Sequence, residues 1–273
     1  ERGGQTQSVK DAVKQEKQKP ANPKGQNAII KKDIELGSDK QRARDNIEAI
    51  RLMLKLEAEG RPATKKEQEI LLKYVGWGGL SNVTYTDYSG KPHRDWVDEH
   101  NELKSLVSAE EFQSIRESTL NAHYTSISVI KAMYDGLRNF GFKGGKILEP
   151  SMGIGHFFGA MPQDMAHTVT VLTGVELDSI TGRIAKQLYP LANIHIKGFE
   201  ETNLPDNYYD VAISNVPFGD YGVVDKRYPN YVTGSIHNYF FAKGLDKVRP
   251  GGLVMFITSR YTLDSKKGYQ VRK

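Results

Sequence analysis

Short apolar runs alternate with amphipathic stretches along the second half of the chain. The apolar runs are rich in β-branched residues and predict strands at 146–148, 168–174, 193–196, 210–214 and 253–258. Helical segments are expected between them, at 126–139, 155–161, 179–189 and 237–248. Buried strands that alternate with helices predict an α/β fold in which helices cover both faces of a parallel sheet.

Residues 36–120 have a helical pattern instead. Apolar residues recur at helical spacing after Ser38, at Ala43, Ile47, Ile50 and Leu54. Three pairs match the capping box that begins many helices: Ser38 with Gln41, Thr64 with Glu67, and Ser108 with Glu111. We therefore expect this part to be a helical appendage, interrupted by a turn at 76–79 (Gly-Trp-Gly-Gly) and packed on the main domain.

The first 35 residues differ from both later parts. They carry eight basic and five acidic side chains, and the first aromatic residue of the chain is Tyr74. This composition predicts a basic polar tail or linker at 1–35, before the appendage at 36–120 and the α/β domain at 121–273. Because the sequence begins at Glu1 and not at Met, we expect a longer parent protein.

Composition excludes several classes of protein. The chain has 273 residues and no cysteine, which excludes a disulfide scaffold, a cysteine nucleophile and a thiolate metal site. We expect no metal, no membrane span and no signal peptide, since the densest apolar run, Leu253–Ile257, is far too short to cross a bilayer. The net charge of +5 is weak evidence for nucleic acid, because the tail supplies most of it.

The candidate chemistry begins where the first predicted strand ends. Glu149 and Pro150 are followed by Gly153 and Gly155, a strand–glycine–helix pattern that brings backbone close to a nucleoside ligand. A dinucleotide site needs a third glycine where this chain has Phe158, and Glu149 would repel phosphates, so the pattern favours a cationic or zwitterionic ligand. The alternative is a tight structural turn.

An acidic residue at the end of the second predicted strand has the place and spacing that suit ribose recognition. Glu176 follows the glycines by about twenty residues, where a carboxylate accepts hydrogen bonds from ribose hydroxyls. Asp178 is instead expected to cap the helix that begins at Ser179.

The most specific feature follows the fourth predicted strand, at Asn215, Val216, Pro217 and Phe218. This segment resembles the N-P-P-F/Y motif of adenine-N6 and related amino-group methyltransferases that use S-adenosylmethionine. The resemblance implies that the Asn215 side chain and the Val216 carbonyl accept hydrogen bonds from the target amine, and that Phe218 stacks on the base. A strand-ending turn with a buried ring is the structural alternative.

The other motifs occur in the order of the gamma-type enzymes of this family, over about residues 120–265. The resemblance implies a Rossmann-like class I methyltransferase sheet with S-adenosylmethionine as cofactor. It assigns the methionine end of the cofactor to Tyr124 and Thr125, and the adenine to the segment at Phe199 and Glu200. It assigns the cofactor loop to Glu149, Pro150, Gly153 and Gly155, and the ribose to Glu176.

Further segments are similar to the methylase-like N-terminal regions of methyltransferase–helicase proteins of conjugative elements and plasmids. They are 76–80, 215–219 and 249–252 with 257–259. The resemblance implies DNA and a downstream helicase region of the parent chain as partners, in the bacterial cytoplasm. We also expect a sheet truncated after its fifth strand, and a fragment that does not methylate specifically by itself. The alternatives are a catalytically silent DNA-binding or scaffolding module, and an RNA base or protein glutamine as acceptor.

Overall fold

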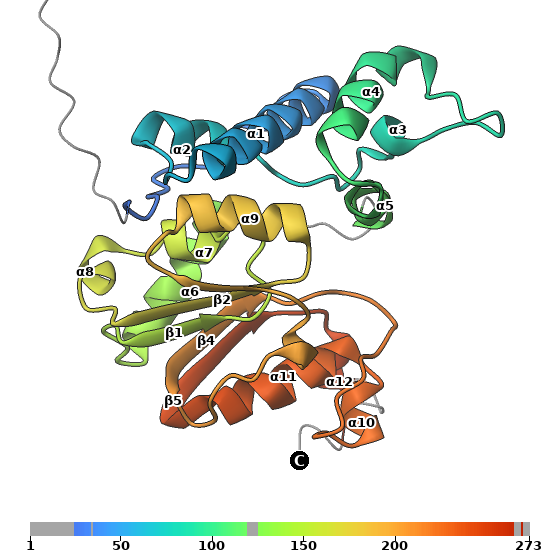
Figure 1. The fold of residues 1–273 in the computed structure, drawn as a ribbon. Helices are drawn as coiled ribbons and strands as arrows, with labels where there is room; N and C mark the ends of the chain where they lie inside the picture. Colours follow the sequence, from blue (N-terminus) through green and yellow to red (C-terminus); the bar gives the residue numbers. More distant parts are fainter. Residues whose placement is uncertain (1–24, 34, 119–124, 265–268, 270–273) are drawn as a thin grey trace, which may run out of the picture.

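The computed structural model describes residues 25–33, 35–118, 125–264 and 269, and its centre is a parallel sheet (Figure 1). The strands lie in the order β3-β2-β1-β4-β5. Their bounds are β1 Lys146–Glu149, β2 Val171–Glu176, β3 Asn193–Ile196, β4 Tyr209–Asn215 and β5 Val248–Ile257. The order reverses between β1 and β4, and in open α/β sheets the crevice at that reversal is the usual ligand site. The predicted Rossmann-like α/β fold is confirmed.

Helices cover both faces of this sheet, and the alternation of side chains along the strands explains why. Ile147 and Ile213 belong to the core that includes α6 and α9, whereas the neighbouring Leu148 and Ala212 belong to the core beneath α11. The helices of this part are α6 Ile127–Asn139, α7 His156–Gly159, α8 Gln163–Ala166, α9 Ser179–Leu188, α10 Asn230–Thr233, α11 Ile236–Lys247 and α12 Tyr261–Asp264, with a 3₁₀ turn η2 at Phe199–Glu201.

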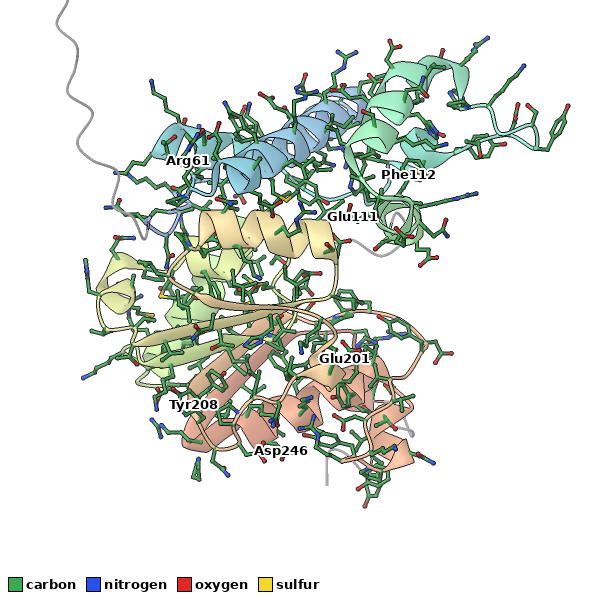
Figure 2. The ribbon with its side chains drawn as sticks, viewed as in Figure 1. Arg61, Glu111, Phe112, Glu201, Tyr208 and Asp246 are labelled. Atoms are coloured by element: carbon green, nitrogen blue, oxygen red, sulfur yellow. The ribbon has the colours of Figure 1, made fainter. Side chains whose placement is uncertain are left out.

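The expected helical appendage lies over α9, on the side away from the sheet (Figure 1). Its helices are α1 Asp39–Glu59, α2 Lys65–Leu71, α3 Ser81–Thr84, α4 Val97–Leu106 and α5 Ala109–Ser118, with a 3₁₀ turn η1 at Arg94–Trp96. Arg183 of α9 donates to Glu57 of α1 at 2.8 Å and to Glu111 of α5 at 2.9 Å, and Figure 2 shows Glu111 at that junction. This shared arginine joins the appendage to the sheet domain.

The predicted caps are present in these helices. Thr64 with Glu67, and Ser108 with Glu111, make both hydrogen bonds of the capping box. Ser38 makes its half of the expected box, because its hydroxyl accepts from the Gln41 amide at 3.3 Å.

The structure differs from the expected tail at residues 25–33. Ala28 and Ile30 are buried, and their amides donate to the carbonyls of Leu188 and Gly159, both at 2.8 Å. These residues therefore pack on the sheet domain as part of its core. The sequence signal that was missed is the short apolar group at 28–30 inside an otherwise polar stretch.

Two strands also begin elsewhere than predicted. β2 starts at Val171 and not at Thr168, because the Thr168 hydroxyl donates to the Met165 carbonyl at 2.8 Å and thereby belongs to the turn after α8. β5 starts at Val248, where an irregularity in the pairing with β4 lies between Tyr209 and Val211. The carboxyl ends of both strands, which matter for the site, lie within two residues of the predictions.

Within the described ranges, no helix combines the length and apolarity needed to span a bilayer. The same ranges contain no group of three or more histidine, aspartate or glutamate side chains arranged to hold a metal ion.

Candidate functional site

The strand order brings three of the predicted site residues to one edge of the sheet. Glu149, Glu176 and Asn215 are the last residues of β1, β2 and β4. Because β1 is hydrogen-bonded to both of the other strands, these three side chains start from neighbouring positions at the carboxyl edge. This edge is the candidate site.

The turn after β1 is tied to the strands on either side of it. The Met152 amide donates to the Val175 carbonyl of β2 at 2.9 Å. The Ser214 hydroxyl of β4 donates to the Ser151 carbonyl at 3.0 Å. Pro150, the first residue of the turn, is buried. The turn is therefore a rigid bridge across the reversal of strand order.

The two glycines of this turn have different reasons to be glycine. Gly155 has a φ of +86°, and a Cβ there would meet the Tyr189 ring at 2.5 Å, so any side chain would clash with the core. Gly153 has a φ of +54° and nothing within 4 Å of its would-be Cβ. Gly155 is thus explained by packing, whereas Gly153 leaves open space beside the strand ends.

Glu176 is held in place by backbone amides. Its Oε2 accepts from the Gly153 amide at 2.8 Å, and its Oε1 accepts from the Asp178 amide at 2.9 Å. Burial nevertheless raises the pKa of Glu176 to about 7. The carboxyl group is therefore oriented by the turn and is poised between its neutral and charged forms near neutral pH.

Glu149 is more deeply buried, with 1% of its surface exposed. Burial, and then the neighbouring Glu176, raise the pKa of Glu149 well above its ordinary value. Its Oε2 has no hydrogen-bond partner in the part of the chain that the structure describes. Neither Glu149 nor Glu176 has an ion-pair partner among the described residues, so a positively charged ligand is favoured here.

Asn215, the last residue of β4, is held in place by a hydrogen bond of its side chain. Its Nδ2 donates to the Thr125 hydroxyl at 3.0 Å. Its Oδ1 is buried and has no partner among the described residues. Such an acceptor costs free energy unless something donates to it, so the geometry leaves a place for a hydrogen-bond donor that this part of the chain does not supply. Thr125 and Asn215 meet although 90 residues separate them.

The residues after Asn215 are held against the end of β5. The Val216 amide donates to the Ile257 carbonyl at 3.1 Å, and the Val216 side chain is buried. Pro217 and Phe218 are half-buried, and the Phe218 ring lies 6.0 Å from the His237 ring of α11. His237 also lies 3.3 Å from the Thr258 hydroxyl, and burial lowers its pKa, so it packs as a neutral ring behind Phe218.

Phe199 and Glu200 lie beyond β3, in η2. The Phe199 ring is buried against Tyr239 and Phe240, so the core takes up the ring itself. Glu200 is half-buried, and its charge acts on Tyr221 of the loop that follows Phe218. Of the predicted pair, Glu200 is therefore the side chain that is not taken up by the core.

Some of the candidate residues fall outside this description or behave as capping residues. Tyr124 lies outside the described residues. Asp178 caps α9 as predicted, because its Oδ1 accepts from the Thr181 amide at 2.8 Å. It also accepts from Ser114 of α5 at 3.2 Å, so the appendage reaches the residues next to Glu176. No pattern in the sequence would place Ser114 or His237 at this edge.

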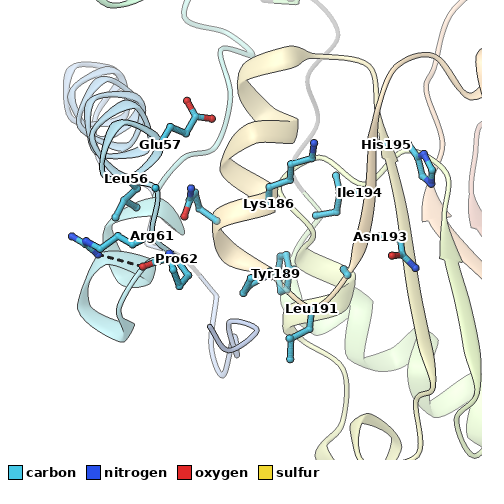
Figure 3. Close-up of a pocket in the computed structure, with 14 residues that line it drawn as sticks. Leu56, Glu57, Arg61, Pro62, Lys186, Tyr189, Leu191, Asn193, Ile194 and His195 are labelled. Atoms are coloured by element: carbon cyan, nitrogen blue, oxygen red, sulfur yellow. Dashed lines mark hydrogen bonds between the residues drawn. The ribbon is translucent and has the colours of Figure 1, made fainter. Parts of the chain in front are cut away.

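A cavity of about 740 Å³ lies elsewhere, between the appendage and the amino end of β3 (Figure 3). Its walls include Arg61, Lys186, Tyr189 and His195. None of the predicted site residues lines it. We place the candidate chemistry at the carboxyl edge, because oriented and unpartnered polar groups gather there.

The comparisons with known proteins give one curated relative and a set of structural neighbours. No known protein-family profile matches the chain. Over 224 residues the chain is 27% identical to the Defense against restriction protein B of Escherichia phage P1, a match that covers 80% of this chain and 8% of that protein. The chain therefore spans a small part of the relative's length.

The structural neighbours are similar at lower identity. A type I restriction-modification methyltransferase subunit from Streptococcus thermophilus is 13% identical, with a TM-score of 0.46 and coverage of 86% of this chain and 72% of that one. A candidate class I S-adenosylmethionine-dependent methyltransferase from Listeria monocytogenes is 15% identical, with a TM-score of 0.45 and coverage of 85% and 78%. The fold assignment itself follows from the strand order β3-β2-β1-β4-β5 and its all-parallel pairing.

Proposed function

We propose that this chain is the methyltransferase region of an enzyme that transfers a methyl group from S-adenosylmethionine to the N6 amino group of adenine in DNA. The observation that carries the proposal is Asn215, a half-buried side chain at the switch point of the sheet whose Oδ1 is buried. Its Nδ2 is committed to Thr125, and its Oδ1 is left to accept a hydrogen bond. An exocyclic amine is a donor of the kind that this acceptor lacks.

The residues at the strand ends fit S-adenosylmethionine. The ligand carries a sulfonium and an ammonium group, and Glu149 and Glu176 are acidic groups with raised pKa values that gain from a nearby positive charge. Glu176 is held by two backbone amides in a position to accept from ribose hydroxyls. The open space at Gly153 lets a ligand approach the backbone of the turn.

When bound, the cofactor supplies an electrophilic methyl group. The chain's own part is to hold the target amine. Asn215 Oδ1 and the Val216 carbonyl accept its two N–H bonds, so that the nitrogen lone pair is turned out of conjugation and oriented for attack. This role needs no strong base, which suits an uncharged asparagine. Phe218, backed by the neutral His237, offers a ring for the base to stack on.

DNA is proposed as the substrate on the motif and on the relative. Asn215, Val216, Pro217 and Phe218 resemble the catalytic motif of adenine-N6 enzymes, and the curated relative is named for defense against restriction, a reaction on DNA. In duplex DNA the adenine must leave the stack, at a cost of about a few kcal/mol. A helicase region on the same parent chain and a bacterial cytoplasmic location belong to the same proposal.

The test is labelled methyl transfer by the natural protein that contains this chain, with and without Asn215→Ala. We expect transfer to DNA to fall by about 100-fold or more, because an oriented acceptor of the target amine is removed. Binding of S-adenosylhomocysteine to the 273-residue chain should fall much less than methyl transfer, since on the cofactor side the variant removes only the hydrogen-bond partner of Thr125. Asn193→Ala, an exposed asparagine at the opposite end of the sheet, is the matched control.

The outcomes separate the alternatives. Unchanged transfer in Asn215→Ala would contradict the proposed role of this residue. Cofactor binding without transfer to DNA, RNA or protein would favour the silent DNA-binding module. Transfer to RNA or to a protein glutamine, and not to DNA, would keep the chemistry and replace the substrate.

A further inference from the structure

A lysine is completely buried in the middle of α11. Lys243 has none of its surface exposed. Its Nζ donates to the Phe199 carbonyl at 2.5 Å and to the Thr202 carbonyl at 3.4 Å, and it lies 3.4 Å from Asp225 Oδ2. Burying an ammonium group costs several kcal/mol unless it is paired, so such a residue is expected only where its partners repay that cost.

The partners of this lysine come from two separate parts of the site. Phe199 is the first residue of η2 and Thr202 follows its last residue; the family resemblance assigns this turn to the cofactor adenine, and the proposed function includes that assignment. Asp225 belongs to the loop that follows Phe218, the proposed stacking residue. The three acceptors match the three N–H bonds of an ammonium group, which a neutral side chain of similar length does not supply.

The Asp225 end of this arrangement is itself firmly held. Tyr239 of α11 donates its hydroxyl to Asp225 Oδ2 at 2.7 Å, and Arg227 donates to the same atom at 2.8 Å. The hydrogen bond from Arg227, above all, holds the pKa of Asp225 well below its usual range. Asp225 is therefore a fixed anchor inside the loop.

The rest of the loop is ordered around that anchor and presents apolar side chains. The Val223 amide donates to the Thr233 carbonyl at 2.9 Å, and the Ile236 amide donates to the Tyr221 carbonyl at 2.8 Å. Tyr221 is 48% exposed and Val224 is 86% exposed. The loop that follows the proposed stacking residue Phe218 is therefore ordered by hydrogen bonds and carries two exposed apolar side chains.

We propose that Lys243 is a positioning residue that couples cofactor binding at the Phe199–Glu201 turn to the loop 219–229, which carries the substrate side of the site. The inference rests on the proposed function, since it takes the turn as the wall of the adenine subsite. When the cofactor orders the turn, the Phe199 and Thr202 carbonyls are held in place around Lys243 Nζ. Lys243 then holds Asp225, and with it the loop. Cofactor binding thereby prepares the surface that meets the second substrate.

The test uses the 273-residue chain and S-adenosylhomocysteine, the demethylated product. Calorimetry gives its affinity, and trypsin cleavage after Lys226 and Arg227, followed by mass spectrometry, reports on the loop. In the wild-type chain we expect saturating product to slow cleavage at these two sites by about tenfold, within the usual range of coupling between sites. In Lys243→Met we expect no slowing, even at concentrations that saturate the weakened site.

Lys247→Met is the matched control. Lys247 lies one turn further along α11, has 2% of its side chain exposed and pairs with Asp206, an exposed residue outside η2 and the loop. We expect this variant to keep the protection of the loop by the product. Loss of protection in both variants, or in neither, would overturn the inference.

A second measurement needs no substitution. Burial, and then Arg227, lower the pKa of Lys243 to about 8. Asp225 and Arg227 face it from the loop, and Tyr239 and Lys247 act on it from α11. The ratio of cleavage rates with and without product should therefore approach one as the pH rises through about 8 in the wild-type chain, as Lys243 loses its charge. A ratio that is independent of pH would contradict the inference.

Failure of the inference and failure of the proposed function give different results. A wild-type chain that does not bind the product overturns both. A wild-type chain that binds the product while its loop is cleaved at an unchanged rate keeps the cofactor site and overturns the coupling alone.

Discussion

Acidic side chains in two places near the carboxyl edge have opposite electrostatic surroundings. At the ends of β1 and β2, Glu149 and Glu176 make no ion pair within the described ranges, and their pKa values are raised. Behind α11, Asp225 pairs with Arg227 and Lys243, and its pKa is lowered. The first group is short of positive charge, whereas the second is fully compensated.

The difference separates binding from positioning. Acidic groups that lack a counter-charge are stabilised when a cationic ligand binds, so the ligand supplies the positive charge that the fold does not. A compensated group gains nothing from a ligand but fixes the elements it joins. Replacing an acidic side chain by its neutral amide should therefore change stability in opposite directions in the two regions, and the predictions below test that contrast.

The largest effect on stability is expected at the compensated group. Asp225→Asn removes the counter-charge of the fully buried Lys243, so we expect the free energy of unfolding to fall by about 3 kcal/mol. Urea unfolding measures this change. Asp206→Asn removes the partner of Lys247, but Asp206 has 64% of its side chain exposed, and its loss should cost about 1 kcal/mol or less. Equal effects in the two variants would show that Asp225 is not a buried anchor.

The next effect is a pH dependence at the uncompensated group. The ordinary pKa of Glu176 is 4.5, and burial raises it to about 7 in the folded chain. The folded state thus holds a proton that the unfolded state releases, so this group stabilises the fold below about pH 4.5 and loses that contribution as the pH rises through about 7. We expect Glu176 to lower the free energy of unfolding by about 2 kcal/mol between about pH 5 and pH 8.

The measurement compares the wild-type chain with Glu176→Gln at each pH. His156 acts in the opposite sense, because burial lowers its pKa to about 4, and the difference between the two proteins removes its contribution. A difference that does not vary over this range would mean that Glu176 titrates at its ordinary pKa.

Much of the fold was predictable because the sequence pattern of each helix and strand agrees with the place of that element in the sheet domain. Residues 193–196 form β3 as predicted, and Asp178 caps α9, since periodicity and capping are properties of neighbouring residues. The carboxyl edge was also predictable, because strand ends in a parallel α/β sheet fall on one side. Glu149, Glu176 and Asn215 therefore lie where the alternation of strands and helices placed them.

The rest depends on contacts between distant residues, and pairwise contacts leave no local pattern in one sequence. Thr125 meets Asn215 across 90 residues, and Lys243 meets Phe199 across 44. A lysine in a helix is ordinarily a solvated charge, so nothing around Lys243 in the sequence marks it as buried. The packing of Ala28 and Ile30 differs, because the short apolar group at 28–30 was a local signal, although the sequence alone does not name its partners Leu188 and Gly159.

The last effect has the opposite sign and is expected for Glu149→Gln. Glu149 is 1% exposed, and burial raises its pKa well above the ordinary value of 4.5, so at about pH 4 the carboxyl is protonated in both the folded and the unfolded chain, and a neutral amide of the same shape should leave stability nearly unchanged. As the pH rises from about 4 to about 8 the unfolded wild-type chain releases this proton, whereas the folded chain must hold it or bury a charge, so we expect the variant to become the more stable of the two. Urea unfolding at the two pH values measures both differences, and titration with S-adenosylmethionine should show weaker binding by the variant. Lower stability at the higher pH would mean that the carboxylate is compensated, and the contrast with Asp225 would then disappear.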